Sequence, residues 1–104
     1  MNSNEKSSHF LELQTKAKAA EGMLKLLANA NRLLILCNLI NSPKNVSELV
    51  EITGLSQSAV SQHLAKMREN NLITSLKNGL TVTYHIQNPR VEALLSTLYL
   101  IYCN

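Results

Sequence analysis

Residues 47–68 encode a short helix, a tight turn and a second helix, and they constrain the fold more than any other stretch. Gly54 stands where the chain must turn sharply. Ser56 follows it and offers a hydroxyl that can accept from the first free N–H groups of the next helix. The apolar residues of the first helix give it one buried side: Leu49, Val50 and Ile52. This order of signals predicts a helix-turn-helix.

The second helix of this motif combines an apolar inner face with a small, polar outer face. Its inward residues recur at steps of four and three: Val60, Leu64 and Met67. Its outward residues are Gln57, Ser58, Ser61, Gln62 and Ala65. Such a helix can enter the DNA major groove, where glutamine reads adenine edges and serine reaches bases or phosphate. An ordinary solvated helix is the alternative, and the agreement of turn, cap and spacing favours DNA binding.

The distribution of charge supports a polyanionic partner. The chain of 104 residues is long enough for one domain with a modest core, and it carries 10 Lys and Arg against 7 acidic residues, a net charge of +3. Between residues 54 and 90 the basic residues are Lys66, Arg68, Lys77 and Arg90, against one acidic residue, Glu69. A basic surface in this half predicts salt-dependent binding.

The N-terminal segment shows neither a targeting nor a membrane signal. Residues 1–8 are polar and have nothing to bury, so we expect a mobile leader followed by a single domain over residues 9–104. No stretch approaches the roughly 20 apolar residues that span a bilayer. We therefore expect a cytoplasmic protein with no membrane partner. In that compartment a bond between Cys37 and Cys103 would be a redox event and not a structural disulfide.

Helices are expected on both sides of the motif. From His9 onward, apolar residues recur at alternating steps of three and four, as in a heptad seam: Phe10, Leu13, Ala17, Ala20, Leu24 and Leu27. Residues 32–40 are apolar almost all round and are expected at the centre of the core. The last helix begins at Pro89 and carries its own stripe: Val91, Leu94, Leu95, Leu98, Ile101 and Tyr102. One small core cannot absorb both stripes, so the first and last helices are predicted to form a homodimer interface.

After the helix-turn-helix the hydrophobic period changes from helical to alternating, which indicates strands. Two such runs, residues 72–77 and 80–86, flank Asn78-Gly79, a signal for a type I′ turn. A hairpin directly after a recognition helix is a wing, and Lys77 and Asn78 at its tip could reach phosphate or the minor groove. The expected fold is mainly α with a small β-hairpin: a winged helix-turn-helix with five helices and a two-stranded wing.

This order of elements resembles the ArsR/SmtB family of small dimeric bacterial repressors over about residues 21–103. The most specific matches are residues 26–36, residues 55–64 and the Asn78-Gly79 wing. The resemblance implies binding to double-stranded operator DNA, which blocks transcription until an inducer releases the protein.

Many members of that family sense metals, and this chain lacks the ligand sets of both common classes. Where arsenic sensors carry Cys-x-Cys, the chain reads Val46-Ser47-Glu48-Leu49, without a thiol. Where zinc sensors place Asp and His pairs along the last helix, it has Arg90, Glu92, Ser96 and Tyr99. The three histidines, His9, His63 and His85, fall on separate expected elements. We therefore predict neither a metal site nor a cofactor.

Cys37 in the second helix and Cys103 near the C-terminus resemble the BigR/HlyU-like, persulfide-responsive branch of the family. The resemblance implies a dithiol switch at these two residues, with a persulfide or polysulfide as inducer. From the residues alone, two inert core thiols are the simpler interpretation. A disulfide needs Cα atoms within about 7 Å and each inserted sulfur adds about 2 Å, so a wider gap would favour a polysulfide bridge. A helix C-terminus opposes a thiolate at Cys103, which makes Cys37 the expected attacking thiol.

Several functions remain open beside a regulator released by reactive sulfur: a metal-responsive repressor, a constitutive DNA-binding regulator with inert cysteines, and a winged helix that binds another protein. An enzyme is not expected, because the chain has no Cys-x-x-Cys motif, Gly-rich phosphate loop or paired carboxylates. The predicted base contacts are Gln57, Ser58, Ser61, Gln62 and His63. The predicted phosphate or groove contacts are Lys66, Arg68, Lys77 and Asn78.

Overall fold

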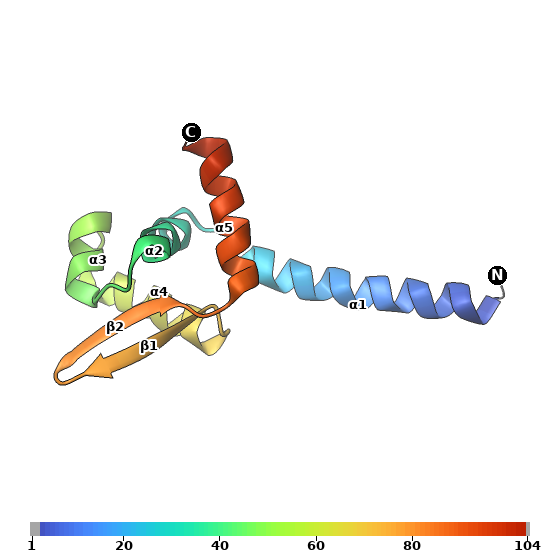
Figure 1. Cartoon of the computed structure of the whole chain (residues 1–104), viewed down its shortest axis with the longest axis horizontal. Helices are drawn as coiled ribbons and strands as arrows, with labels where there is room; N and C mark the ends of the chain where they lie inside the picture. The colour runs from blue at the N-terminus through green and yellow to red at the C-terminus, as the bar shows by residue number, and fades with distance from the viewer. Residues whose placement is uncertain (1–2, 104) are drawn as a thin grey trace.

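The computed structural model describes residues 3–103 of the chain, and side-chain surroundings from Ser7 onward. Within that range five helices and one hairpin follow in the order α1 Ser3–Leu27, α2 Ala30–Asn41, α3 Val46–Thr53, α4 Gln57–Glu69, β1 Ile73–Asn78, β2 Thr81–Ile86 and α5 Pro89–Tyr102. Helix α1 extends to one side of the packed body and the hairpin to the other (Figure 1). The principal dimensions are 59 × 33 × 20 Å. The predicted winged helix-turn-helix with its two-stranded wing is confirmed.

The core is centred on α2, as its apolar sequence predicts. Ile35 and Leu36 are fully buried. The surrounding helices and strand β1 contribute the other fully buried side chains of the core: Leu49, Val60, Leu64, Met67, Ile73, Val91 and Leu95. The three inward residues predicted for α4 are all in this set. Ile52, which was predicted to be buried, is 44% exposed, because it lies at the edge of the α3 face that is centred on Leu49.

The helix-turn-helix is set by local signals that the sequence predicts. Gly54 ends α3 in the left-handed region with φ of +73°, and its N–H donates to the Val50 carbonyl at 2.9 Å. Ser56 is the N-cap of α4, and its Oγ accepts from the Ala59 N–H at 3.1 Å. Asn45 caps α3 in the same way and forms a capping box with Glu48. These caps fix where each helix begins and therefore which α4 residues face outward.

Alanine at Gly54 and at Gly22 should have opposite effects on stability. Because Gly54 needs a positive φ, Gly54→Ala should lower the free energy of unfolding by about 1–2 kcal/mol. Gly22 lies inside α1, and an added Cβ there would meet nothing within 4 Å, so Gly22→Ala should raise it by about 0.5–1 kcal/mol. Urea denaturation followed by circular dichroism measures both. Equal effects of the two substitutions would contradict the left-handed cap.

The hairpin differs from its predicted turn. Strands β1 and β2 pair antiparallel from Ile73 with Ile86 to Asn78 with Thr81, so the two connecting residues are Gly79 and Leu80. Within residues 3–103, Gly79 has a positive φ of +65° and Leu80 does not. A positive φ at the first central position alone is the pattern of a type II′ turn, so the predicted type I′ turn at Asn78-Gly79 is wrong. Asn78 keeps its ladder partner, and the turn lies one residue further along.

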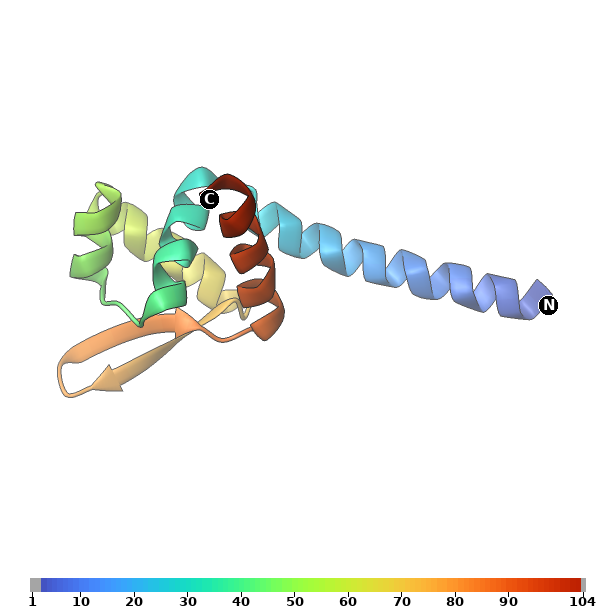
Figure 2. The ribbon, with the colours of Figure 1, turned by 45° about the horizontal axis from the view of Figure 1, so that its top comes forward.

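A backbone bridge attaches the hairpin to the body. The Lys44 N–H donates to the Tyr84 carbonyl at 3.1 Å, and the Tyr84 N–H donates to the Lys44 carbonyl at 2.8 Å. The loop between α2 and α3 therefore runs beside β2 and holds the base of the wing. Figure 2 shows the hairpin crossing beneath the helical body while its turn stays free.

The start of α1 differs from the predicted start near His9. The helix begins at Ser3, and residues 3–8, which were expected to be part of a mobile leader, continue it; residues 1–2 lie outside the described range. Extending an existing helix is easy, because nucleation and not propagation is the unfavourable step. No single helix within residues 3–103 is long and apolar enough to cross a bilayer, and the one helix pair that meets those criteria jointly, Ser7–Leu27 with Ala30–Asn41, is bent by 92°.

Candidate nucleic-acid interface and dithiol pair

The outer face of α4 is a polar surface open to solvent. The exposed residues are those that the sequence predicts: Gln57, Ser58, Ser61, Gln62 and Ala65. The Ser58 Oγ lies 3.3 Å from the Oγ of the N-cap Ser56. The other polar side chains of this face form no side-chain hydrogen bond within the described part of the chain. Their amides and hydroxyls are therefore available to an external partner.

His63 is separated from that face. Its side chain is half-buried, and burial lowers its pKa, as do the nearby cations of Arg32 and Lys66. The imidazole is therefore neutral near pH 7. Because it lies toward Arg32, at the start of α2, the structure does not group it with the other predicted base contacts.

The end of α4 packs against strand β1 of the wing. Lys66 and Arg68 lie in the last turn of α4 and are exposed. Arg68 donates from Nη1 to the Ser75 Oγ at 3.3 Å and so joins α4 to β1. Lys77 and Asn78 are exposed beside the hairpin turn. Arg68 therefore has a hydrogen-bond partner within the fold. The sequence alone does not identify this partner, because the pairing of the two strands determines that Ser75 lies beside Arg68.

Helices α2 and α5, which carry the two cysteines, pack against each other. Cys37 lies on α2 and is half-buried, Cys103 is the C-cap of α5 and is exposed, and both are free thiols. Burial raises the pKa of the Cys37 thiol, and the neighbouring Cys103 raises it further. A cavity of about 280 Å³ opens beside Cys37 and is lined by Cys37, Ile40, Asn41, Ser96, Tyr99 and Leu100. The fold therefore brings together residues of α2 and α5 that lie far apart in the sequence.

Helical spacing could have identified the polar neighbours of these thiols. Asn41 follows Cys37 by four positions, and Tyr99 precedes Cys103 by four, so each shares a helix face with its cysteine. The Cys103 N–H donates to the Tyr99 carbonyl at 2.8 Å, which fixes the last turn of α5 beside the cavity. The sequence alone does not identify Asn41 and Tyr99 as neighbours, because it does not show that these faces of α2 and α5 pack together.

The different exposures of the two thiols bear on which of them reacts first. A raised pKa keeps Cys37 protonated near neutral pH, and only the thiolate is a strong nucleophile. The thiol of Cys103 is exposed, so a reagent in solution can reach it directly. The expectation that Cys37 attacks first is therefore not supported, and we infer that Cys103 is modified before Cys37.

Iodoacetamide should alkylate Cys103 about tenfold faster than Cys37 near neutral pH. The Cys37 rate should keep rising as the pH increases, because a raised pKa moves its thiolate to more alkaline solution. Intact mass spectrometry of the Cys37→Ser and Cys103→Ser variants measures each rate separately. Both rates should become similar in urea, and similar rates in the folded protein would contradict the inferred order.

Metal ligands are not gathered at the α2–α5 junction or elsewhere within residues 3–103. No three side chains of His, Cys, Asp or Glu come together there in a way that could hold a metal ion. The histidines lie on three elements, with His9 on α1, His63 on α4 and His85 on β2. The described residues therefore do not supply the three or four ligands that a soft or borderline ion requires.

Comparisons with known proteins place this architecture among bacterial regulators. Residues 29–75 match the family described as bacterial regulatory protein, arsR family. The chain is 46% identical to the HTH-type transcriptional regulator YgaV of Escherichia coli over 97 residues, which cover 92% of this chain and 98% of that protein. It is also similar to the reduced form of HlyU from Vibrio cholerae, with a TM-score of 0.86, 39% identity and coverage of 89% and 98%. The transcriptional repressor BigR from Xylella fastidiosa has a TM-score of 0.81 and 27% identity, over 88% of this chain and 91% of that one.

Proposed function

The chain belongs to the ArsR family of DNA-binding transcriptional regulators, and on that premise we propose that it is a homodimeric repressor released from its operator by reactive sulfur acting on Cys37 and Cys103. The observation that carries this proposal is that two free thiols lie on the packed helices α2 and α5, near enough for Cys103 to affect Cys37 electrostatically. BigR is described as a repressor and HlyU as an activator. We favour repression because operator occupancy alone is sufficient for it. Because operator DNA lies in the cytoplasm of a bacterium, the proposed function requires a cytoplasmic protein.

A second copy of the chain is the proposed partner of α1 and α5. Both helices expose large apolar side chains within the described range: Phe10, Leu13 and Leu24 on α1, and Leu100, Ile101 and Tyr102 on α5. Exposed apolar surface of this extent is typical of a protein–protein interface. Two-fold pairing through these helices would bury that surface and would set the two α4 helices roughly 34 Å apart, one turn of DNA. In this arrangement α4 enters the major groove, and the wing reaches the flanking backbone.

The proposed sulfur chemistry needs no oxidant other than the persulfide itself. A cysteine thiolate attacks the outer sulfur of a persulfide donor, RSSH, and releases the thiol RSH, which leaves a cysteine persulfide. A second donor extends it by one sulfur in the same way. The other cysteine thiolate then attacks the sulfur next to the terminal one and expels HS⁻, which leaves a trisulfide between the two residues. The sulfane sulfur is reduced to HS⁻ as the two thiols are oxidised.

This bridge would connect the helix that carries the core to a helix of the dimer interface. Ile35 and Leu36 of α2 pack in the core with Leu64 and Met67 of α4. A covalent bond between α2 and α5 would therefore change how the two α4 helices are held relative to each other. A hundredfold loss of operator affinity requires about 2.7 kcal/mol of coupling.

Binding to a duplex from the protein's own upstream region tests the function. Reduced protein should bind it in preference to an unrelated duplex, and a persulfide donor should abolish that preference. A gel shift that stays blank at low salt would favour a winged helix that binds protein. Release by zinc or arsenite in a Cys37→Ser, Cys103→Ser double variant would favour a metal-responsive repressor.

Lys77→Ala should weaken binding to all DNA sequences alike and lower the slope of log affinity against log salt by about one unit. The reason is that Lys77 lies exposed at the wing tip and is proposed to neutralise one phosphate. Fluorescence anisotropy at several salt concentrations measures the slope. Lys16→Ala is the matched control, because Lys16 pairs with Glu12 on α1 at 2.8 Å and lies outside the proposed interface. An unchanged slope in Lys77→Ala would remove the wing from the contacts.

A further inference from the structure

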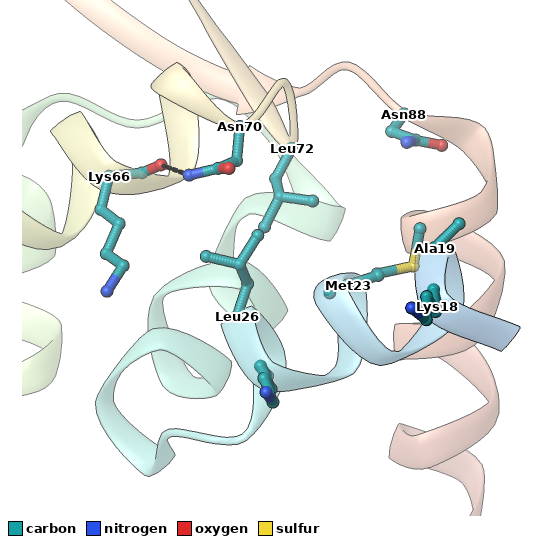
Figure 3. Close-up of a pocket in the computed structure, with 10 residues that line it drawn as sticks. Lys18, Ala19, Met23, Leu26, Lys66, Asn70, Leu72 and Asn88 are labelled. Carbon is teal, nitrogen blue, oxygen red and sulfur yellow. Dashed lines mark hydrogen bonds between the residues drawn. The ribbon is translucent and has the colours of Figure 1, made fainter. Parts of the chain in front are cut away.

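A larger pocket, separate from the cavity beside Cys37, opens between the end of α1, the end of α4 and the start of α5 (Figure 3). Its volume is about 530 Å³, and its lining residues are Lys18, Ala19, Gly22, Met23, Lys25, Leu26, Lys66, Asn70, Leu72 and Asn88. We propose that this pocket binds a small organic anion, with a carboxylate, sulfonate or phosphate group on an apolar body.

The charge of the rim selects for an anion. Three lysines and no acidic residue line the pocket. Lys25 has its Nζ 3.5 Å from the Glu21 carboxylate in an exposed pair. The ammonium groups of Lys18 and Lys66 have no carboxylate within salt-bridge distance in the described part of the chain. An anion would therefore meet two uncompensated positive charges on opposite walls.

The floor of the pocket is apolar. Figure 3 shows Met23, Leu26 and Leu72 between the lysines that stand at either side. Leu72 is only 2% exposed, and Met23 and Leu26 pack partly against the core. Pockets for small organic ligands typically measure about 300–1,000 Å³ and combine an apolar lining with a few polar groups. The composition therefore suits an anion with an aromatic or aliphatic body better than free phosphate.

Two asparagines complete the polar edge. The Asn88 Oδ1 accepts from the Arg90 N–H at 2.9 Å, which leaves its amide NH₂ available to a ligand at the positive end of α5. The Asn70 Nδ2 donates to the Lys66 carbonyl at 2.8 Å. The same carbonyl also accepts from the Asn70 backbone N–H at 3.3 Å, so this bond fixes the Asn70 side chain at the end of α4 beside the pocket.

The basic side of this pocket and the predicted dimer seam lie on different faces of α1. Lys18, Gly22 and Lys25 are spaced by four and three residues and share one face of α1. The predicted seam residues Ala17 and Ala20 lie on a different face. A ligand in the pocket would contact both proposed dimer helices and the recognition helix, so its binding should also change operator affinity.

Anilinonaphthalene sulfonate, an organic anion with an aromatic body, is the probe for this site. Full-length reduced protein should bind it, with a rise in fluorescence. The Lys18→Gln, Lys66→Gln double variant should bind it at least tenfold more weakly, whereas Lys16→Gln should not. The uncharged analogue N-phenylnaphthylamine should bind the lysine variant and the parent protein alike. Sulfonate binding that is unchanged in the lysine variant would overturn the proposal.

Filling the pocket provides an independent test. Gly22→Phe introduces a bulky side chain at a position where an added Cβ meets nothing, and it should abolish binding of the probe, whereas Gly22→Ala should retain it. Sedimentation should show that both variants keep the parent's oligomeric state. Retained probe binding in a folded Gly22→Phe variant would contradict the site. A lower slope of log operator affinity against log salt in Lys18→Gln, measured without probe, would assign the pocket to a DNA phosphate and overturn the small-anion proposal.

Discussion

Ser61→Glu should lower operator affinity at least a hundredfold, which corresponds to about 2.7 kcal/mol. Ser61 lies in the middle of the exposed face of α4, one turn after Gln57 and beside Gln62. A carboxylate at this position would face the acceptor-rich floor of the major groove and the phosphates that border it. Opposed like charges at an interface cost several kcal/mol. The fold should be unaffected, because the side chain is exposed and makes no hydrogen bond that the structure describes.

Gln14→Glu is the control for this substitution, because it adds the same charge to an exposed position of α1. Its operator affinity should stay close to that of the parent protein, apart from a small change that disappears at higher salt. Fluorescence anisotropy with a labelled operator duplex measures both variants. If Ser61→Glu and Gln14→Glu behaved alike, α4 would not be the recognition helix.

A persulfide donor should lower the operator affinity of the parent protein about a hundredfold and leave the Cys37→Ser and Cys103→Ser variants unchanged. Neither single variant should respond to the donor, because the proposed trisulfide needs a cysteine sulfur from each of the helices α2 and α5. Neither substitution should impair DNA binding in the reduced protein, since both thiols lie at the α2–α5 junction and not on the α4 face. Equal release of the parent and of either variant would contradict the dithiol switch.

Dithiothreitol should restore the affinity of the treated parent protein, because reduction of the trisulfide regenerates two thiols. The order of reaction provides a second control. Cys103 should become a persulfide in the Cys37→Ser variant sooner than Cys37 does in the Cys103→Ser variant, since burial alone still raises the pKa of Cys37 there. The opposite order would restore Cys37 as the attacking residue.

The sequence predicts the recognition motif well because its determinants are local. A cap at Ser56 and inward residues at Val60 and Leu64 are decided within one or two helical turns, and the structure confirms them. The start of α1 was placed too late, because polar residues continue a helix as readily as they form a leader. The turn was assigned to Asn78-Gly79, because the sequence signal for a type I′ turn does not reveal which residues keep their cross-strand partners.

The candidate sites depend on contacts between distant segments, and these are less visible in the sequence. The resemblance to the ArsR family identifies Cys37 and Cys103 as candidates. The packing of α2 against α5 then shows a cavity beside Cys37, which the sequence does not reveal. The reactivity of Cys37 depends on its burial, which spacing alone does not determine. The sequence predicts Lys66 only as a DNA contact and assigns no site role to Lys18, because only the fold shows that α4 and α1 place them around one apolar floor.

Intact mass spectrometry of the reduced protein after persulfide treatment, combined with operator binding of the same sample, tests the central claim most directly. We expect a monomer that has gained whole sulfur atoms and lost two hydrogens, with fragments that join Cys37 to Cys103, and with operator affinity reduced about a hundredfold. Hydrogen peroxide should not produce this species. A protein that remains unmodified, or that acquires the sulfur bridge and still binds its operator, would contradict the proposed switch.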